Sequence, residues 1–310
     1  MGFVADLLLK DLDIHVTFPW GISIVSNMAY PDMTQSDDNF IEGVRAIVDD
    51  PFFDGVEMPY PPEKLWGGLE KLVEDRFVIV GAQSDVIKHG FNPSSSNEDE
   101  RKKAVTHFGE IIETAGDHDV PLIALCSGPD PGAGKRDEAA TKLVGSLREL
   151  CAKAEDYDVN LLLETFDRSY DRKLLIGPME EAVKVVSEVR KDYFNIGLLW
   201  DLSHSPIIGE KPDVLRQAAE YLDHIHIGCA KKGDKGGLLD EHPGFYSKNS
   251  INTTKDVSEL LEILMDVSYC GMVGFEVKPQ EYQSSKEVVS TAKGVLIEAF
   301  QKAIPRILGK

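Results

Sequence analysis

Short apolar runs alternate along the chain with longer segments in which apolar residues recur every three or four positions. The short runs are typical of buried β-strands and the longer segments of amphipathic helices, so their alternation predicts parallel β/α units. The predicted strands are Asp13–Phe18, Gly55–Met58, Phe77–Gly81, Leu122–Cys126, Asn160–Glu164, Asn195–Asp201, His224–Gly228 and Val273–Val277. The predicted helices are Asn39–Val48, Pro62–Glu74, Glu98–Ala115, Glu138–Ala154, Met179–Val189, Asp213–Tyr221, Asp256–Val267 and Ser285–Ile304.

The number of these elements indicates the fold. Eight strands and eight helices are the count of a closed (β/α)8 barrel, so we expect an α/β fold of the TIM barrel class. The main rival, an open doubly wound sheet, normally has a glycine-rich phosphate-binding loop after its first strand. Residues 19–23 follow the first predicted strand and lack the GxGxxG spacing. Because no linker or repeat divides the sequence, we expect one domain over residues 1–310.

Charged side chains stand at the ends of the last four predicted strands. Glu164, Asp201 and Glu276 each end or nearly end an apolar run, and His226 lies near the end of another. In α/β barrels the C-terminal ends of the strands meet at one face, where the reactive side chains lie. Three carboxylates and one imidazole suit a divalent ion such as Mn, Mg, Co or Zn. The sequence therefore predicts a metal site built from these four residues.

Composition narrows the class of partner. The formal net charge of the 310 residues is -20, which disfavours binding to the phosphates of nucleic acid. The four cysteines have no metal-binding spacing, and residues 1–6 do not resemble a secretory leader, so we expect reduced thiols and a cytoplasmic protein. No apolar run approaches the roughly 18 residues of a membrane span, and we expect no membrane partner.

Four short motifs resemble those of one known family. ETF at Glu164, WDLSH at Asp201, HIHIG around His226 and FEVKP at Glu276 are similar to motifs of the xylose isomerase-like barrel superfamily. Within it, the order of residues is most similar to that of ketose 3-epimerases, hydroxypyruvate isomerases, inosose dehydratases and class IV apurinic endonucleases. The resemblance covers the C-terminal half by motif and the N-terminal half only by the count of strands and helices.

The resemblance implies roles for individual residues. In the epimerases two metal-bound glutamates also transfer protons, which implies Glu164 and Glu276 as the catalytic acid and base. The histidine of the AspxxHis motif contacts substrate in those enzymes, which implies the same for His204. An arginine follows the ligand histidine by six residues in the epimerases, and Lys232 stands at that position here.

Asp240 and His242 resemble a pair of zinc ligands of the apurinic endonucleases. Those enzymes also use histidines after strands three and four, where this chain has residues 82–84 and 126–128 with no histidine. A single metal ion is therefore expected. Asp240 and His242 then have two possible roles: they close over the pocket as an additional metal or pocket site, or they form a plain turn.

These observations predict a metal-dependent isomerase or epimerase that moves protons through an enediolate of a small ketose or related polyhydroxy carbonyl compound. We expect one divalent ion, with Mn as the first choice, a small sugar as substrate, and a homo-oligomer from base rates alone. Three alternatives stay open: a metal-dependent phosphodiesterase of the apurinic endonuclease type, an inosose dehydratase-like lyase, and a non-enzymatic barrel with a structural ion.

Overall fold

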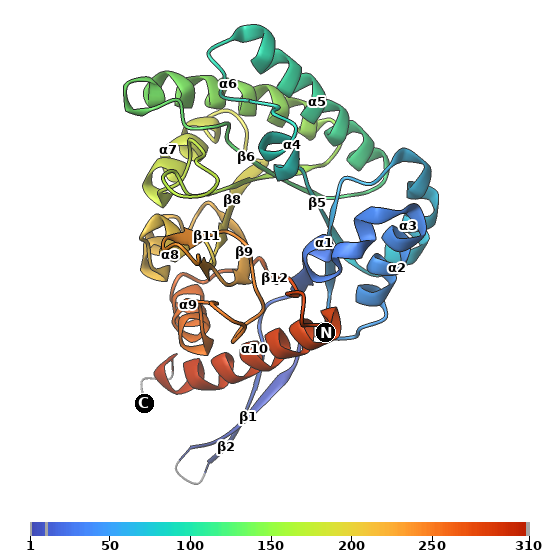
Figure 1. The fold of residues 1–310 in the computed structure, drawn as a ribbon, viewed down its shortest axis with the longest axis vertical. Coiled ribbons are helices and arrows are strands. Elements are labelled where there is room, and N and C mark those ends of the chain that lie inside the picture. The colour runs from blue at the N-terminus through green and yellow to red at the C-terminus, as the bar shows by residue number, and fades with distance from the viewer. Residues whose placement is uncertain (1, 10–11, 308–310) are drawn as a thin grey trace.

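A ring of eight parallel strands forms the centre of the protein, and helices surround it (Figure 1). The computed structural model describes residues 2–9 and 12–307; the remaining positions of the predicted domain 1–310 lie outside the described residues. The barrel strands are β3 (Ile22–Ile24), β4 (Gly55–Pro59), β5 (Phe77–Gly81), β6 (Leu122–Cys126), β7 (Asn160–Glu164), β8 (Ile196–Asp201), β9 (Leu222–Gly228) and β12 (Met272–Glu276). The predicted TIM barrel class is confirmed.

The strands follow one another around the ring in the order β3-β12-β9-β8-β7-β6-β5-β4. The ring is completed between β3 and β4, where Val25 bridges to Glu57 and the Asp54 N–H donates to the Ile22 carbonyl at 2.7 Å. Inside the ring, one interior layer consists of buried apolar side chains from four adjacent strands, namely Ile79, Ala124, Leu162 and Leu199. This layer of the interior is therefore packed core, as is usual for a closed barrel.

The strands are covered by long helices on the outside. These are α2 (Asp37–Val48), α3 (Trp66–Val73), α5 (Glu98–Asp117), α6 (Arg136–Glu155), α7 (Met179–Val189), α9 (Thr254–Asp266) and α10 (Ser285–Ile307). Short helices lie in the connections: α1 (Ser26–Ala29), α4 (Gln83–Ile87), α8 (Ser205–Ile208), η1 (Pro31–Gln35), η2 (Glu63–Leu65), η3 (Ala133–Lys135) and η4 (Pro212–Gln217). No helix in the described part of the chain has the length and apolar character needed to cross a membrane.

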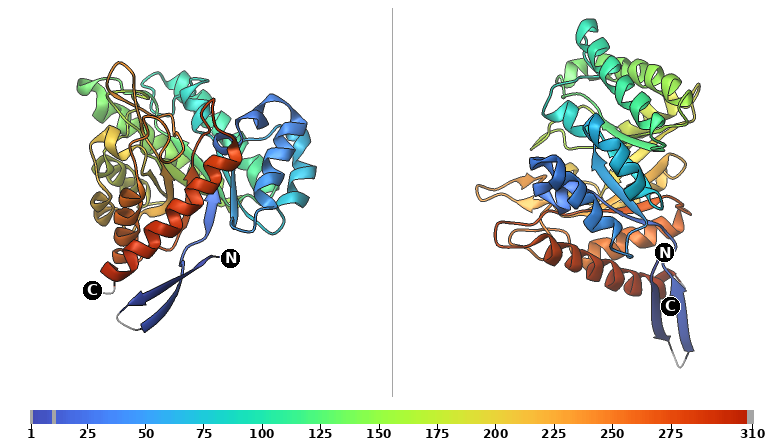
Figure 2. Two further views of the ribbon diagram at one scale, coloured as in Figure 1. Left: turned by 60° about the horizontal axis from the view of Figure 1, so that its bottom comes forward. Right: turned by 90° about the vertical axis from the view of Figure 1, so that its right-hand side faces the viewer.

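The predicted first barrel strand was wrong. Asp13–Phe18 falls largely on β2 (Leu12–Thr17), which pairs antiparallel with β1 (Val4–Leu9) in a hairpin that projects from the barrel (Figure 2). Exposed and partly buried residues alternate along residues 13–17, whereas all three residues of β3 are buried. Alternation is typical of an antiparallel ribbon and continuous burial of a parallel barrel strand, so the pattern itself distinguishes the two.

One predicted helix was also wrong in type and length. Residues 213–221 were expected to form an α-helix, but the chain forms the 3₁₀-helix η4 and then enters β9 at Leu222. Short 3₁₀ segments are common as connectors, and residues 218–221 alone separate η4 from β9. A second small hairpin, β10 (Lys231–Lys232) with β11 (Leu238–Leu239), follows β9.

Candidate metal and substrate site

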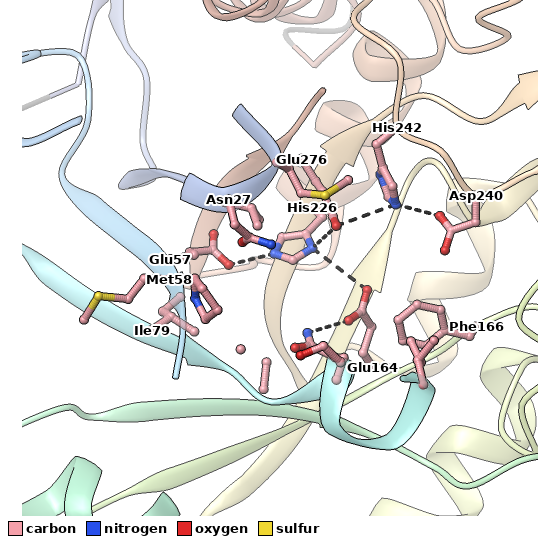
Figure 3. A pocket seen from close by; sticks show the side chains of 18 of the residues that line it. Asn27, Glu57, Met58, Ile79, Glu164, Phe166, His226, Asp240, His242 and Glu276 are labelled. Atoms are coloured by element: carbon pink, nitrogen blue, oxygen red, sulfur yellow. Dashed lines mark hydrogen bonds and ion pairs between the residues drawn. The ribbon is translucent and has the colours of Figure 1, made fainter. Parts of the chain in front are cut away.

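The four predicted metal ligands meet at the C-terminal end of the barrel (Figure 3). Glu164, Asp201 and Glu276 are the last residues of β7, β8 and β12, and His226 lies two residues before the end of β9. One donor atom from each of the four lies within 4.8 Å of the others. The parallel register of adjacent strands places these ends side by side, as the sequence predicted.

The His226 ring shows how a cation would fit this cluster. Its Nε2 lies 2.8 Å from Glu57 Oε2, so this nitrogen donates to a carboxylate behind the ring. Its Nδ1 lies 2.9 Å from Glu276 Oε2 and 4.0 Å from Glu164 Oε1, yet this buried nitrogen has no partner with hydrogen-bond geometry. One imidazole nitrogen and three carboxylates that converge in this way form a donor set suited to a divalent cation, so the residues present fit a metal ion.

The two glutamates of the cluster differ in protonation. Burial raises the pKa of Glu164 to about 8, because the charged form loses its hydration. Burial acts on Glu276 as well, but the neighbouring His242 and His226 imidazoles lower the pKa of Glu276 to about 2. Without a cation, the cluster therefore holds a proton on Glu164 and a negative charge on Glu276.

A second polar cluster surrounds Asp240. Its Oδ1 lies 2.6 Å from His242 Nε2 and 3.1 Å from His204 Nε2, and Arg172 Nε donates to its Oδ2 at 2.7 Å. Asp240 and His242 are 3% exposed and line the cavity, so these two residues belong to the pocket. Asp201, His204 and His242 also come close enough together to hold a cation. The Arg172 guanidinium already supplies positive charge to Asp240.

The predicted substrate contacts lie in different places. His204 is buried with its Nδ1 2.9 Å from the Thr165 carbonyl, and Asp240 and Asp201 raise its pKa well above the ordinary value although burial lowers it. His204 is not among the described residues that line the cavity, although it contacts Asp240, which is, so its predicted contact with substrate stays a prediction. Lys232 is exposed on β10 and is not among the described residues that line the cavity. Its contact with substrate stays a prediction.

Three residues at the site were missed by sequence reasoning. Gln83, in the helix after β5, donates from Nε2 to Glu164 Oε2 at 2.7 Å. Arg172 lies in the long connection after β7, and Glu57 lies within β4. The signal for Glu57 was present, because an acidic residue inside the apolar run GVEMP is costly to bury without a partner. Nothing local to Gln83 or Arg172 indicated their partners.

Comparison with known proteins assigns the chain to a superfamily of barrels. The model of the xylose isomerase-like TIM barrel family matches residues 41–294. No curated protein matches the chain by sequence.

Several solved structures share the fold. The IolI protein with a bound zinc atom has a TM-score of 0.72 at 19% identity, covering 91% of this chain and 99% of IolI. A D-tagatose 3-epimerase-like protein has a TM-score of 0.69 at 21% identity, covering 93% of this chain and 99% of that protein. The 3-keto-D-glucoside 4-epimerase YcjR from E. coli has a TM-score of 0.67 at 16% identity, covering 89% of this chain and 98% of YcjR. At these identities the likeness shows the fold.

Proposed function

Because the chain belongs to the xylose isomerase-like TIM barrel family, we propose that it is a divalent-metal-dependent sugar isomerase or epimerase. Its substrate class is a small ketose or a related polyhydroxy carbonyl compound. The observation that carries this proposal is the meeting of three carboxylates around an imidazole nitrogen that has no hydrogen-bond partner. The names of two structural relatives, a tagatose 3-epimerase-like protein and a ketoglucoside 4-epimerase, support a sugar as substrate.

The metal would be held by Glu164, Asp201, His226 and Glu276. Three oxygen donors and one nitrogen favour Mn first, with Mg, Co or Zn compatible, and the zinc in IolI supports a divalent ion. When bound, such an ion polarises a carbonyl oxygen and stabilises the negative charge of the enediolate as it forms.

Glu164 and Glu276 would transfer the protons. Both carboxylates face the same nitrogen of His226, Nδ1 (Figure 3), and Gln83 holds one oxygen of Glu164 by a hydrogen bond. One carboxylate removes the proton from the carbon beside the carbonyl, and the other returns a proton. Return to the opposite face of the same carbon gives epimerisation, and return to the neighbouring carbon gives isomerisation.

The cluster around Asp240 favours a second candidate, a metal-dependent phosphodiesterase with more than one ion. Asp201, His204 and His242 approach closely enough to hold another cation. The Arg172 guanidinium on Asp240 favours the single-ion enzyme, because a fixed positive charge there repels a second cation. A lyase that removes water from a cyclitol would use the same proton abstraction and differs only in its product.

The test is the variant Glu276→Gln, assayed with Mn and a panel of ketoses in D2O. We expect the wild-type protein to place deuterium on the carbon beside the carbonyl, and the variant to lose about 10²–10⁴-fold in rate. Glu241→Gln is the matched control, because Glu241 lies in the connection between β11 and β12, pairs with Lys231 and should leave turnover unchanged.

Full turnover by Glu276→Gln would overturn the proposed acid–base role. Metal content is measured for each variant, so that loss of the ion is distinguished from loss of proton transfer. Cleavage of an abasic duplex, with no deuterium incorporation into any ketose, would favour the phosphodiesterase. Loss of water from an inosose would favour the lyase.

A further inference from the structure

Glu57 reaches across the barrel interior from β4 to the histidines of β9. It is 4% exposed, and its Oε1 accepts from Ser23 Oγ at 2.6 Å and lies 3.0 Å from His224 Nε2. Its Oε2 lies 2.8 Å from His226 Nε2. One carboxylate of β4 therefore contacts both β3 and β9, directly behind a candidate metal ligand (Figure 3).

The path of Glu57 depends on small residues in the two intervening strands. Ser23 of β3, Gly274 of β12 and His226 of β9 are register partners and form one row across the sheet. A Cβ placed on Gly274 would lie 2.2 Å from Glu57 Oε1 and 3.0 Å from both Ser23 Oγ and His226 Cδ2. Only glycine at this position leaves room for the Glu57 carboxylate beside the His226 ring.

These contacts determine which nitrogen of His226 carries a proton. A carboxylate is an acceptor, so when Nδ1 binds a cation the hydrogen of the neutral ring stands on Nε2, where Glu57 accepts it. In a neutral imidazole the other nitrogen, Nδ1, then has a free lone pair, and that is the buried nitrogen without a partner. Partners of this kind fix the ring orientation and basicity of metal-binding histidines.

We propose that Glu57 is a positioning residue that holds His226 in the Nε2–H tautomer with Nδ1 aimed at Glu164, Asp201 and Glu276. His224 and Ser23 fix the carboxylate in turn, and Gly274 provides the opening through which it reaches the ring. This inference rests on the proposed function in one respect, which is that the cluster binds a divalent ion.

The first test measures Zn binding to the Glu57→Gln protein by calorimetric titration. The amide keeps the size of the side chain but presents an N–H or a weaker acceptor to Nε2. We expect an affinity about 10–100-fold weaker than that of the wild type, with every candidate ligand still in place. Circular dichroism and thermal melting check that the variant folds.

A second variant disrupts the contact between Glu57 and His226 without replacing a charged residue. Gly274→Ala displaces Glu57 by sterics alone and should weaken Zn binding in the same direction. Gly294→Ala in α10 is the matched control, because its Cβ meets no atom within 4 Å, and its Zn affinity should equal that of the wild type.

The third measurement is the ¹⁵N spectrum of the histidine rings in the zinc-loaded wild type. We expect zinc on Nδ1 of His226 and hydrogen on Nε2. Zinc on Nε2, or unchanged affinity in folded Glu57→Gln, would overturn the positioning role while leaving the proposed function standing. A wild-type protein that binds no divalent ion would overturn both.

Discussion

At the C-terminal end of the barrel, each of several buried charged side chains has its own hydrogen-bond partner. Gln83 donates to Glu164, Arg172 donates to Asp240, and Glu57 accepts from His226. A buried charge without such a partner costs several kcal/mol, so this density of carboxylates requires either these contacts or a bound cation. At the residue scale, the protonation of the ligands is therefore linked to metal binding.

We expect divalent-metal binding to release a proton and to tighten as the pH rises. A carboxyl group must lose its proton to coordinate a cation, and burial raises the pKa of Glu164 to about 8 in the metal-free protein. Below that pH, binding has to displace the proton, so affinity falls with falling pH. Glu276, with a pKa lowered to about 2, is already ionised and adds nothing to the release.

The measurement is titration calorimetry with Mn in buffers of different ionisation enthalpy, on either side of the Glu164 pKa. Glu164→Gln lacks the titrating group and serves as the control; it should bind more weakly and release fewer protons. An affinity that does not change with pH, without proton release, would contradict the coupling.

At the scale of elements, the two ends of the barrel differ in the side chains that they bury. The C-terminal strand ends hold the polar site, whereas the opposite end is packed with aromatic rings. Phe300 of α10 is fully buried there, with ring centroids 5.1 Å from Phe18 and 5.7 Å from Phe3. In barrels of this class, changes at the N-terminal face affect stability and changes at the C-terminal face affect chemistry.

We expect Phe300→Ala to lower the free energy of unfolding by about 3–5 kcal/mol, because the removed ring leaves a cavity that the packed helix and strands cannot close. Urea denaturation measures this change. Phe194→Ala is the control, since Phe194 is 79% exposed and its removal should cost little. Metal affinity of folded Phe300→Ala should match the wild type, and a large loss would show that the two ends are coupled.

At the scale of the whole molecule, charge is the dominant property. The net charge of -20 repels the phosphate backbone of nucleic acid, which is bound mainly by lysine and arginine. Among the described residues that line the cavity, the lysine and arginine side chains are Lys88 and Arg172. The expected absence of a nucleic-acid partner, the cytoplasmic location and the homo-oligomeric state stay predictions.

We therefore expect no saturable binding of abasic duplex DNA at physiological salt, measured by fluorescence anisotropy with Mn or Zn present. The same duplex without the abasic site is the control. Tight binding that prefers the abasic duplex would contradict this expectation and would favour the phosphodiesterase.

Periodicity and residue type along the chain were enough to predict the barrel and the four candidate ligands. Parallel strands end at one face, so residues such as Glu164 and Asp201 at successive strand ends had to become neighbours. The alternation of apolar and polar residues in β2 was also present in the sequence, although the first barrel strand was misplaced.

Only the tertiary structure decided which side chains support that cluster. Glu57 contacts His226 because the ring of strands closes between β3 and β4. The contact also requires Gly274, which has no side chain to fill the space between Glu57 and His226. Arg172 meets Asp240 because two long connections fold over the same barrel end. Local patterns carry no information about such contacts, since they depend on barrel closure and loop path, which join residues far apart in the chain.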